Sequence, residues 1–350
     1  MVKKDLTKDE LQSIHNDKPY KRKLAYLILS FGWIAVILAI VSSIYFGASN
    51  IHYATVWKGI FFYNPTNSTH VIIHDLRLPR ALAAVFVGAG LAVSGAIMQG
   101  MTRNPLASPS ILGVTSGSLF FMAIAFAFFP NLTYRNSLLF SFVGAGVGAA
   151  LVFSIVAVAK GGNATVKLAL AGSAISSLLS ALSTAIGLRF NVSKDMSYWY
   201  AGGIAGIQLN QLKYVMPIII IGIVIAIILS RSITVLSLGE GVATGLGQKT
   251  KFVRFTGIVV VLLLTGASVS IAGMIGFIGL VIPHITRFLV GSDYRFIIPC
   301  SAILGALALL GADILARMIN APFETPVGAV TAIIGVPFFL YLARKEGGAL

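Results

Sequence analysis

Charged residues are scarce in this sequence. Asp, Glu, Lys and Arg together make up 11% of the 350 residues, whereas an average soluble domain carries about 25%. Hydrophobic residues make up 57% and form runs long enough to span about 30 Å of hydrocarbon as helices. The composition excludes an ordinary soluble domain and predicts an all-α, polytopic membrane protein.

Cysteine, carboxylates and histidine are scarce as well. Cys300 is the single cysteine, which excludes a disulfide within the chain and a thiolate metal cluster. The five histidines show no HExxH pattern. Carboxylates are almost absent from the apolar runs, so neither a metal hydrolase nor a proton relay finds its ligands there. We therefore expect no catalytic residue, no cofactor and no metal in this chain.

Positive charge lies mostly between the apolar runs. The net charge is +15, but a nucleic-acid reader concentrates its cations on a soluble face, so we expect no nucleic-acid partner. Residues 1–23 are polar and hold seven Lys and Arg residues, and the apolar run 24–46 that follows is longer than a signal-peptide core. The positive-inside tendency predicts a cytoplasmic N-terminal tail, residues 1–23, before a transmembrane domain, residues 24–350.

Hydropathy predicts ten spans, which would place both termini in the cytoplasm. The predicted spans are 24–46, 78–98, 110–129, 138–159, 166–188, 214–229, 255–271, 275–290, 296–310 and 327–343. Glycines recur within them, which favours close approach of helices. Proline-bearing breaks at 104–109 and around Pro283 are typical of transporters with interrupted helices.

The longest polar interruption in the second half of the chain is the segment 231–254. On the ten-span topology it is a cytoplasmic loop. Gly239, Gly241 and Gly245 permit sharp backbone turns, so we expect two very short helices that form a compact docking element. An ordinary solvated connector is the alternative.

Four ordered motifs resemble a single family. They are RLPRALAAVFVGAGLAVSGAIMQGMTRNPLASPSILGVTSGS (77–118), SLGEGVATGLG (237–247), GFIGLVIPHITRFLVGSDYR (276–295) and GADILAR (311–317). The chain is similar in these motifs to the FecCD-type permeases, the membrane subunits of ABC importers for iron siderophores, haem and cobalamin. Only the N-terminal tail is longer than such proteins usually carry. The resemblance implies a ten-helix transport subunit of a bacterial cytoplasmic membrane, with no enzymatic activity of its own.

The resemblance also implies partners and a cargo. The partners are a second permease subunit, identical or related, two cytoplasmic ATPase subunits, an extracellular or periplasmic substrate-binding protein, and the lipid bilayer. The cargo is an iron–siderophore complex, with haem and cobalamin as alternatives. An ion-coupled secondary transporter is the competing interpretation, but it needs intramembrane carboxylates or cation sites that the spans lack. A membrane-embedded enzyme would need clustered titratable groups, for which His284 is the one candidate.

By the same resemblance, two groups of residues act on the cytoplasmic side. Coupling to the ATPase falls to Leu238, Gly239, Glu240, Gly241, Ala243, Leu246 and Gly247. A gate that closes the pathway toward the cytoplasm falls to Asn104, Pro105, Leu106, Asn163, Ala164 and Thr165. Ordinary short turns are the alternative for the gate segments.

Three arginines lie on the outer face of the predicted topology, against the positive-inside tendency. Arg77 and Arg80 are three residues apart at the start of the second span, and Arg317 follows the ninth. Anchoring to lipid headgroups is one interpretation. The resemblance implies the sharper one, in which the three planar guanidiniums receive carboxylates of the binding protein.

Overall fold

A computed structural model of the chain describes residues 8–46, 52–159, 164–321 and 323–347. The regular elements in these ranges are all helices, which confirms the all-α prediction. Seven helices are long and apolar enough to cross a membrane by length and composition, and three shorter apolar helices accompany them. Each of the ten predicted spans coincides with one of these helices.

The bounds of the elements differ from the predicted spans mainly at their ends. The ten helices that match spans are α1 (Lys8–Tyr45), α4 (Leu78–Thr102), α5 (Val114–Phe128), α6 (Tyr134–Val158), α7 (Ala164–Arg189), α9 (Leu209–Ser237), α11 (Thr250–Ala272), α12 (Ile278–Val290), α13 (Tyr294–Ile319) and α14 (Val327–Gly347). Six short helical segments connect them: α2 (Tyr53–Phe61), α3 (Ser68–Val71), the π-helical η1 (Ile72–Arg77), the 3₁₀ segment η2 (Pro109–Leu112), α8 (Ser193–Ala201) and α10 (Glu240–Gly245).

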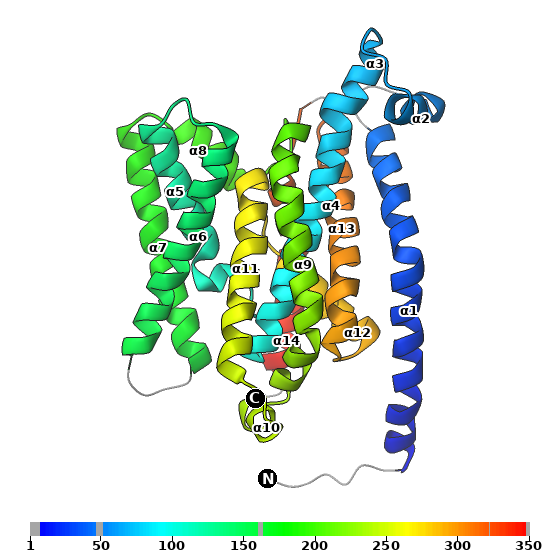
Figure 1. Cartoon of the computed structure of the whole chain (residues 1–350), viewed down its shortest axis with the longest axis vertical. Helices are drawn as coiled ribbons and strands as arrows, with labels where there is room; N and C mark the ends of the chain where they lie inside the picture. Colours follow the sequence, from blue (N-terminus) through cyan, green and yellow to red (C-terminus); the bar gives the residue numbers. More distant parts are fainter. Residues whose placement is uncertain (1–7, 47–51, 160–163, 322, 348–350) are drawn as a thin grey trace.

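Helix α1 begins earlier than its predicted span. It is continuous from Lys8, so residues 8–23, predicted as a polar tail, form its first turns. Figure 1 shows α1 at the edge of the bundle, with its N-terminal end on the same side of the molecule as α10. We call this side the α10 end, and the opposite side, where α2, α3 and α8 lie, the α8 end.

Helix α4 occupies the centre of the helix packing. It contacts α9, α11, α12 and α13, and most of its residues are buried. Glycines permit the close approach, because a Cβ on Gly88 would collide with the carbonyl oxygen of Gly305 in α13, and a Cβ on Gly95 would collide with that of Gly279 in α12. Where lipid supplies no hydrophobic drive, such backbone contact provides the van der Waals attraction between helices.

A second group of helices, α5 to α8, lies to one side of α4 (Figure 1). Within it, α5 and α6 approach each other at Gly117 and Gly144, where a Cβ on either residue would meet the other's carbonyl oxygen. Helix α11 joins the two groups. The hydroxyl of Ser141 in α6 donates a hydrogen bond to the carbonyl oxygen of Gly266 in α11, at 3.1 Å.

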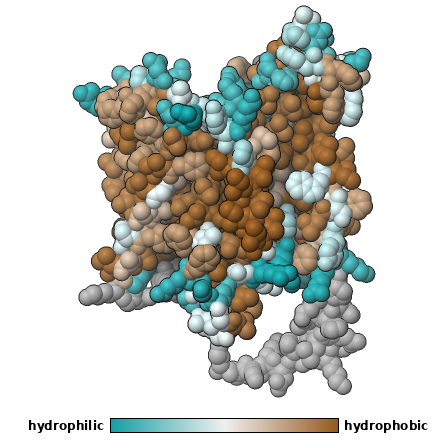
Figure 2. Space-filling view, in the orientation of Figure 1, coloured by the Kyte–Doolittle hydropathy of each residue, from teal (hydrophilic) through white to brown (hydrophobic). Residues whose placement is uncertain are grey.

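Apolar side chains cover the flank of the bundle. Figure 2 shows brown residues over the middle of the molecule and teal residues gathered at its two ends. Helix α1 contributes the exposed side chains of Phe31, Trp33 and Leu38 to this apolar surface. An apolar middle between polar ends is the surface that a bilayer requires.

Two interruptions of the helical bundle bear on the breaks that the sequence predicted. The first interruption, 103–113, follows α4 as predicted, and the second lies at 273–277, between α11 and α12. The predicted break around Pro283 is therefore wrong in position, since this proline lies inside α12. Left-handed backbone at Gly273 and Phe277 makes the turn instead, with φ of 63° and 66°. A proline within a helix removes only one hydrogen bond, that to the carbonyl four residues earlier, and neighbouring helices support the helix around it.

Candidate functional site

The predicted coupling residues lie together at the α10 end. Helix α9 continues through Arg231 to Ser237 and α11 begins at Thr250, so the connection is shorter than the predicted loop 231–254. It contains one short helix, α10, where two were predicted. Gly241 lies inside α10 and Gly245 is its last residue. Glycine permits a turn but does not require one, and within this connection only Gly239 and Gly247 adopt positive φ.

Contacts on both sides hold α10 in place. The fully buried Ala243 forms its inner face. The side-chain amide of Gln248 donates to the carbonyl oxygen of Ser232 in α9, at 2.8 Å. Glu240 pairs with Arg254 of α11, at 2.9 Å. Sequence reasoning missed this pair, although both of its residues lay within the segment that it singled out.

The connection that contains α10, residues 238–249, exposes apolar side chains. Leu238, Val242 and Leu246 are 65%, 49% and 68% exposed. A Cβ on Gly241 would meet nothing within 4 Å, so this residue faces open space. An exposed apolar element on a fixed base, beyond the apolar flank of the bundle, has the properties of a protein docking surface.

The two predicted gate segments adjoin two elements, η2 and α7, that contact each other. The side-chain oxygen of Asn104 accepts a hydrogen bond from the backbone nitrogen of Leu106, at 2.9 Å, which fixes the turn that contains Pro105. This turn leads to η2, and η2 packs against α7. Ala164 and Thr165 are the first two residues of α7. Asn163 lies outside the described residues.

A cavity of about 670 Å³ lies between the two interruptions. One wall comes from Ser108, Pro109 and Ser110 at η2, and another from residues 274–277. Helix α14 contributes Gly328, Ala329, Ala332 and Phe339, and most of the remaining lining is apolar. Sequence reasoning indicated interrupted helices but gave no means to place them around one cavity.

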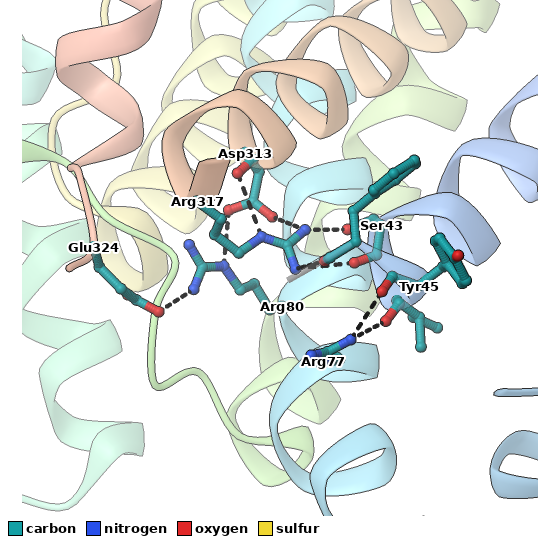
Figure 3. Close-up of polar contacts among 9 residues, drawn as sticks. Ser43, Tyr45, Arg77, Arg80, Asp313, Arg317 and Glu324 are labelled. Atoms are coloured by element: carbon teal, nitrogen blue, oxygen red, sulfur yellow. Dashed lines mark hydrogen bonds and ion pairs between the residues drawn. The ribbon is translucent and has the colours of Figure 1, made fainter. Parts of the chain in front are cut away.

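The three predicted docking arginines lie close together at the α8 end, and two of them, Arg80 and Arg317, share one carboxylate (Figure 3). Asp313 of α13 is fully buried. Its Oδ1 lies 2.8 Å from Nε of Arg80, and its Oδ2 lies 2.9 Å from Nη2 of Arg317. Arg80 also pairs with Glu324, which precedes α14, with Nη1 and Oε1 2.6 Å apart.

The end of α1 is held by the same cluster. Arg77 donates to the carbonyl oxygens of Ile44 and Tyr45, at 2.6 and 3.1 Å. Arg317 donates to the hydroxyl of Ser43, at 2.7 Å. The last carbonyls of a helix have no partner within the helix, so these guanidiniums both satisfy them and attach α1 to α4 and α13. The side chains of Arg80 and Arg317 are 8% and 9% exposed.

Sequence reasoning did not find Asp313, Glu324 or Ser43. A signal was present for Asp313, which precedes Arg317 by four residues in GADILAR, the spacing of neighbours on one helix face. Glu324 and Ser43 carry no such signal. They meet their partners only through the packing of segments more than 200 residues apart.

Comparison with known proteins settles the family. The FecCD transport family matches residues 35–345 of the chain. This chain belongs to the FecCD transport family. Among its relatives, the iron(3+)-hydroxamate import permease FhuB of Bacillus subtilis is 58% identical over 322 residues, which are 92% of this chain and 84% of FhuB. The iron-uptake permease FeuB of the same organism is 45% identical, over 94% of this chain and 98% of FeuB.

A solved structure shares the FecCD fold. It is an inward-facing metal-chelate type ABC transporter, with a TM-score of 0.78 and 31% identity over 92% of this chain and 99% of the other. The FecCD chain is thus the permease of an ABC importer, a multi-pass membrane protein and a transport component rather than an enzyme. Permeases of this family work with an ATPase and a binding protein.

Proposed function

We propose that this permease carries ferric siderophores, and ferric hydroxamates in particular. The observation that carries the proposal is the 58% identity to the iron(3+)-hydroxamate permease of Bacillus subtilis. Identity falls to 44% for a ferric citrate permease and to 34% for a hemin permease. Haem and cobalamin are the competing cargoes.

The cavity supports passage of a bulky chelate. Its walls are mainly apolar, and Ser108, Ser110 and Thr115 supply most of its hydroxyl groups. A wall without charged groups offers weak attachment, which suits a path that must release its cargo. We propose that the binding protein at the α8 end selects the cargo and that a second permease subunit, identical or related, completes the path.

We propose that the α10 end faces the cytoplasm. Four cations flank α10 in the sequence, as the positive-inside tendency predicts for a cytoplasmic segment. They are Arg231, Lys249, Lys251 and Arg254. On this orientation, α10 docks on the ATPase through Leu238 and Leu246, and both termini are cytoplasmic.

Docking of the binding protein on Arg77, Arg80 and Arg317 stays a prediction. All three side chains have partners within the chain, so a carboxylate of the binding protein would have to replace one of them. Charge reversal at Arg77 or Arg317 should lower binding-protein affinity, with an opposite reversal on the partner as the rescue. Thermal unfolding of each variant is the necessary control, because reversal also breaks contacts to α1.

Uptake by the reconstituted complex tests the cargo and the energy source together. Proteoliposomes holding the permease and its ATPases, with binding protein added outside, would receive ferric hydroxamate, ferric catecholate, haem and cobalamin in turn. We expect uptake of the ferric hydroxamate, dependent on ATP. Uptake driven by an ion gradient without ATP would refute the ABC mechanism, and ATP-driven uptake of haem or cobalamin alone would refute the proposed cargo.

The coupling element has its own test. Gly241→Trp adds bulk to the exposed face of α10, where nothing lies within 4 Å, so folding should be unaffected while ATP-driven uptake is lost. Normal uptake in this variant would remove the docking role of α10.

The gate assignment is tested by accessibility. Cysteines at Leu106 and Thr165 should change their labelling rate between the nucleotide-free and ATP-bound complex, because both segments are proposed to close the path. Equal rates in both states would rule out the gate.

A further inference from the structure

Three connections at the α8 end meet above the cavity and form a cover. They are residues 202–205, 273–277 and 324–328. Backbone hydrogen bonds join them, since the nitrogen of Gly328 donates to the carbonyl oxygen of Gly202 and the nitrogen of Gly203 donates to that of Ala272, both at 3.0 Å. We call these three connections the cover.

The cover is packed backbone against backbone. A Cβ on Gly202 would overlap the carbonyl oxygen of Met274, and a Cβ on Gly328 would overlap that of Ala201. Gly202 also adopts a φ of 65°, which favours glycine. No side chain separates the three connections at these points, so they pack tightly.

The cavity lies directly beneath the cover. The cover and the cavity share residues. The cavity lining includes three residues of the cover, Met274, Pro326 and Gly328, and also Ala201, which adjoins the cover. Displacement of residues 324–328 from the other two connections would therefore open the cavity toward the α8 end.

A single ion pair ties the residues 324–328 to the central helix. Glu324 pairs with Arg80 of α4, and its side chain is 53% exposed, whereas that of Arg80 is 8% exposed. Arg80 is held by the fully buried Asp313 through a separate nitrogen. When Glu324 leaves, Arg80 keeps its ion pair with the buried Asp313.

We propose that the Arg80–Glu324 pair is a latch that holds the cover closed over the cavity. Its fixed half is the Arg80–Asp313 pair, and its moving half is Glu324. The carboxylate of Glu324 is half-exposed and is hydrated when released, so the strength of the latch depends on ionic strength. The latch itself does not depend on how the chain is oriented in the membrane. The proposed orientation, with the α8 end outside, decides only from which side of the membrane a labelling reagent is added.

Access to a cysteine in the cavity tests the latch. Ala332 of α14 lines the cavity, and the native Cys300 is fully buried, so an Ala332→Cys chain carries one reactive thiol. A membrane-impermeant maleimide is added to cells that express the whole importer, and the labelling rate is normalised to total Ala332→Cys after solubilisation. Glu324→Gln should raise the rate about five-fold, as expected for loss of one partly exposed ion pair. Glu324→Asp, which keeps the charge on a shorter side chain, should give an intermediate rate.

The chain offers a matched control for loss of charge. Asp75 at the α8 end is 54% exposed and pairs with His74 at 2.9 Å, so Asp75→Asn removes a carboxylate of the same exposure away from the cover. It should leave the rate unchanged. Raising the salt concentration should speed labelling in the parent but not in Glu324→Gln, a difference that simple loosening of the fold would not produce.

Several outcomes would overturn the proposal. The latch is refuted if Glu324→Gln labels at the parent's rate, if Asp75→Asn raises the rate equally, or if salt accelerates both chains alike. A cysteine at the exposed Ser197 of α8 reports the orientation separately. If that cysteine is labelled only in inside-out vesicles, the orientation proposal fails, and the same comparison of variants in those vesicles still tests the latch.

Discussion

Replacing Asp313 by Asn should destabilise the chain strongly, because two guanidiniums share this buried carboxylate. Arg80 and Arg317 approach it to 2.8 and 2.9 Å. At an effective dielectric constant of about 20, one such contact gains roughly 6 kcal/mol of Coulomb energy, and desolvation of the ions offsets much of it. Removal of one partner leaves that desolvation uncompensated, so the expected loss is about 3–5 kcal/mol in the free energy of unfolding.

The single cysteine provides the assay. Cys300 is fully buried in α13, so a thiol-reactive fluorophore reports unfolding of the purified chain as the temperature rises. Asp313→Asn should react at a clearly lower temperature than the parent. The control is Asp75→Asn, which removes an exposed carboxylate and should shift the midpoint little.

A double-mutant cycle separates the ion pair from other effects of the substitution. Arg317→Gln also loses its hydrogen bonds to α1, so its cost alone does not measure the pair. If Asp313 and Arg317 are coupled, the double variant should lose less than the sum of the single variants, by about 1–3 kcal/mol. An Asp313→Asn chain that unfolds at the parent's temperature, or strictly additive costs, would refute the reasoning.

Three further predictions concern packing, the α10 base and pH. Gly95→Ala should prevent formation of a monodisperse folded chain in size-exclusion chromatography, because its Cβ would collide with Gly279, while Gly241→Ala should be tolerated. Glu240→Gln breaks a half-exposed pair with Arg254 and should change thermal stability by less than about 1 kcal/mol, measured with the same fluorophore. Burial raises the pKa of Asp293, but hydrogen bonds from Arg295 outweigh it and hold the pKa below its usual value. The stabilisation is therefore present above the unfolded pKa and lost as pH falls through the folded pKa, so Asp293→Asn should flatten the acid limb of stability in circular dichroism melts.

The apolar runs of the sequence determined the helix class and located seven long and three shorter apolar helices. Bilayer thickness requires apolar runs of about 20 residues, and each predicted span coincides with a helix. The flanking polar residues predicted the ends of these helices only approximately. Local signals failed where backbone chemistry permits two outcomes. Gly241 allowed a turn yet lies inside α10, and Pro283 allowed a break yet lies inside α12.

The motifs of the sequence also indicated the family and placed the predicted coupling residues in one short connection, because those residues are neighbours in the chain. The tertiary structure alone decided what Arg77, Arg80 and Arg317 contact. Their partners lie on α1, on α13 and before α14, and only helix packing brings these segments together. Hydropathy along a sequence predicts at which end of a helix an arginine lies, whereas the carboxylate that it meets depends on which helix faces, far apart in the chain, come into contact.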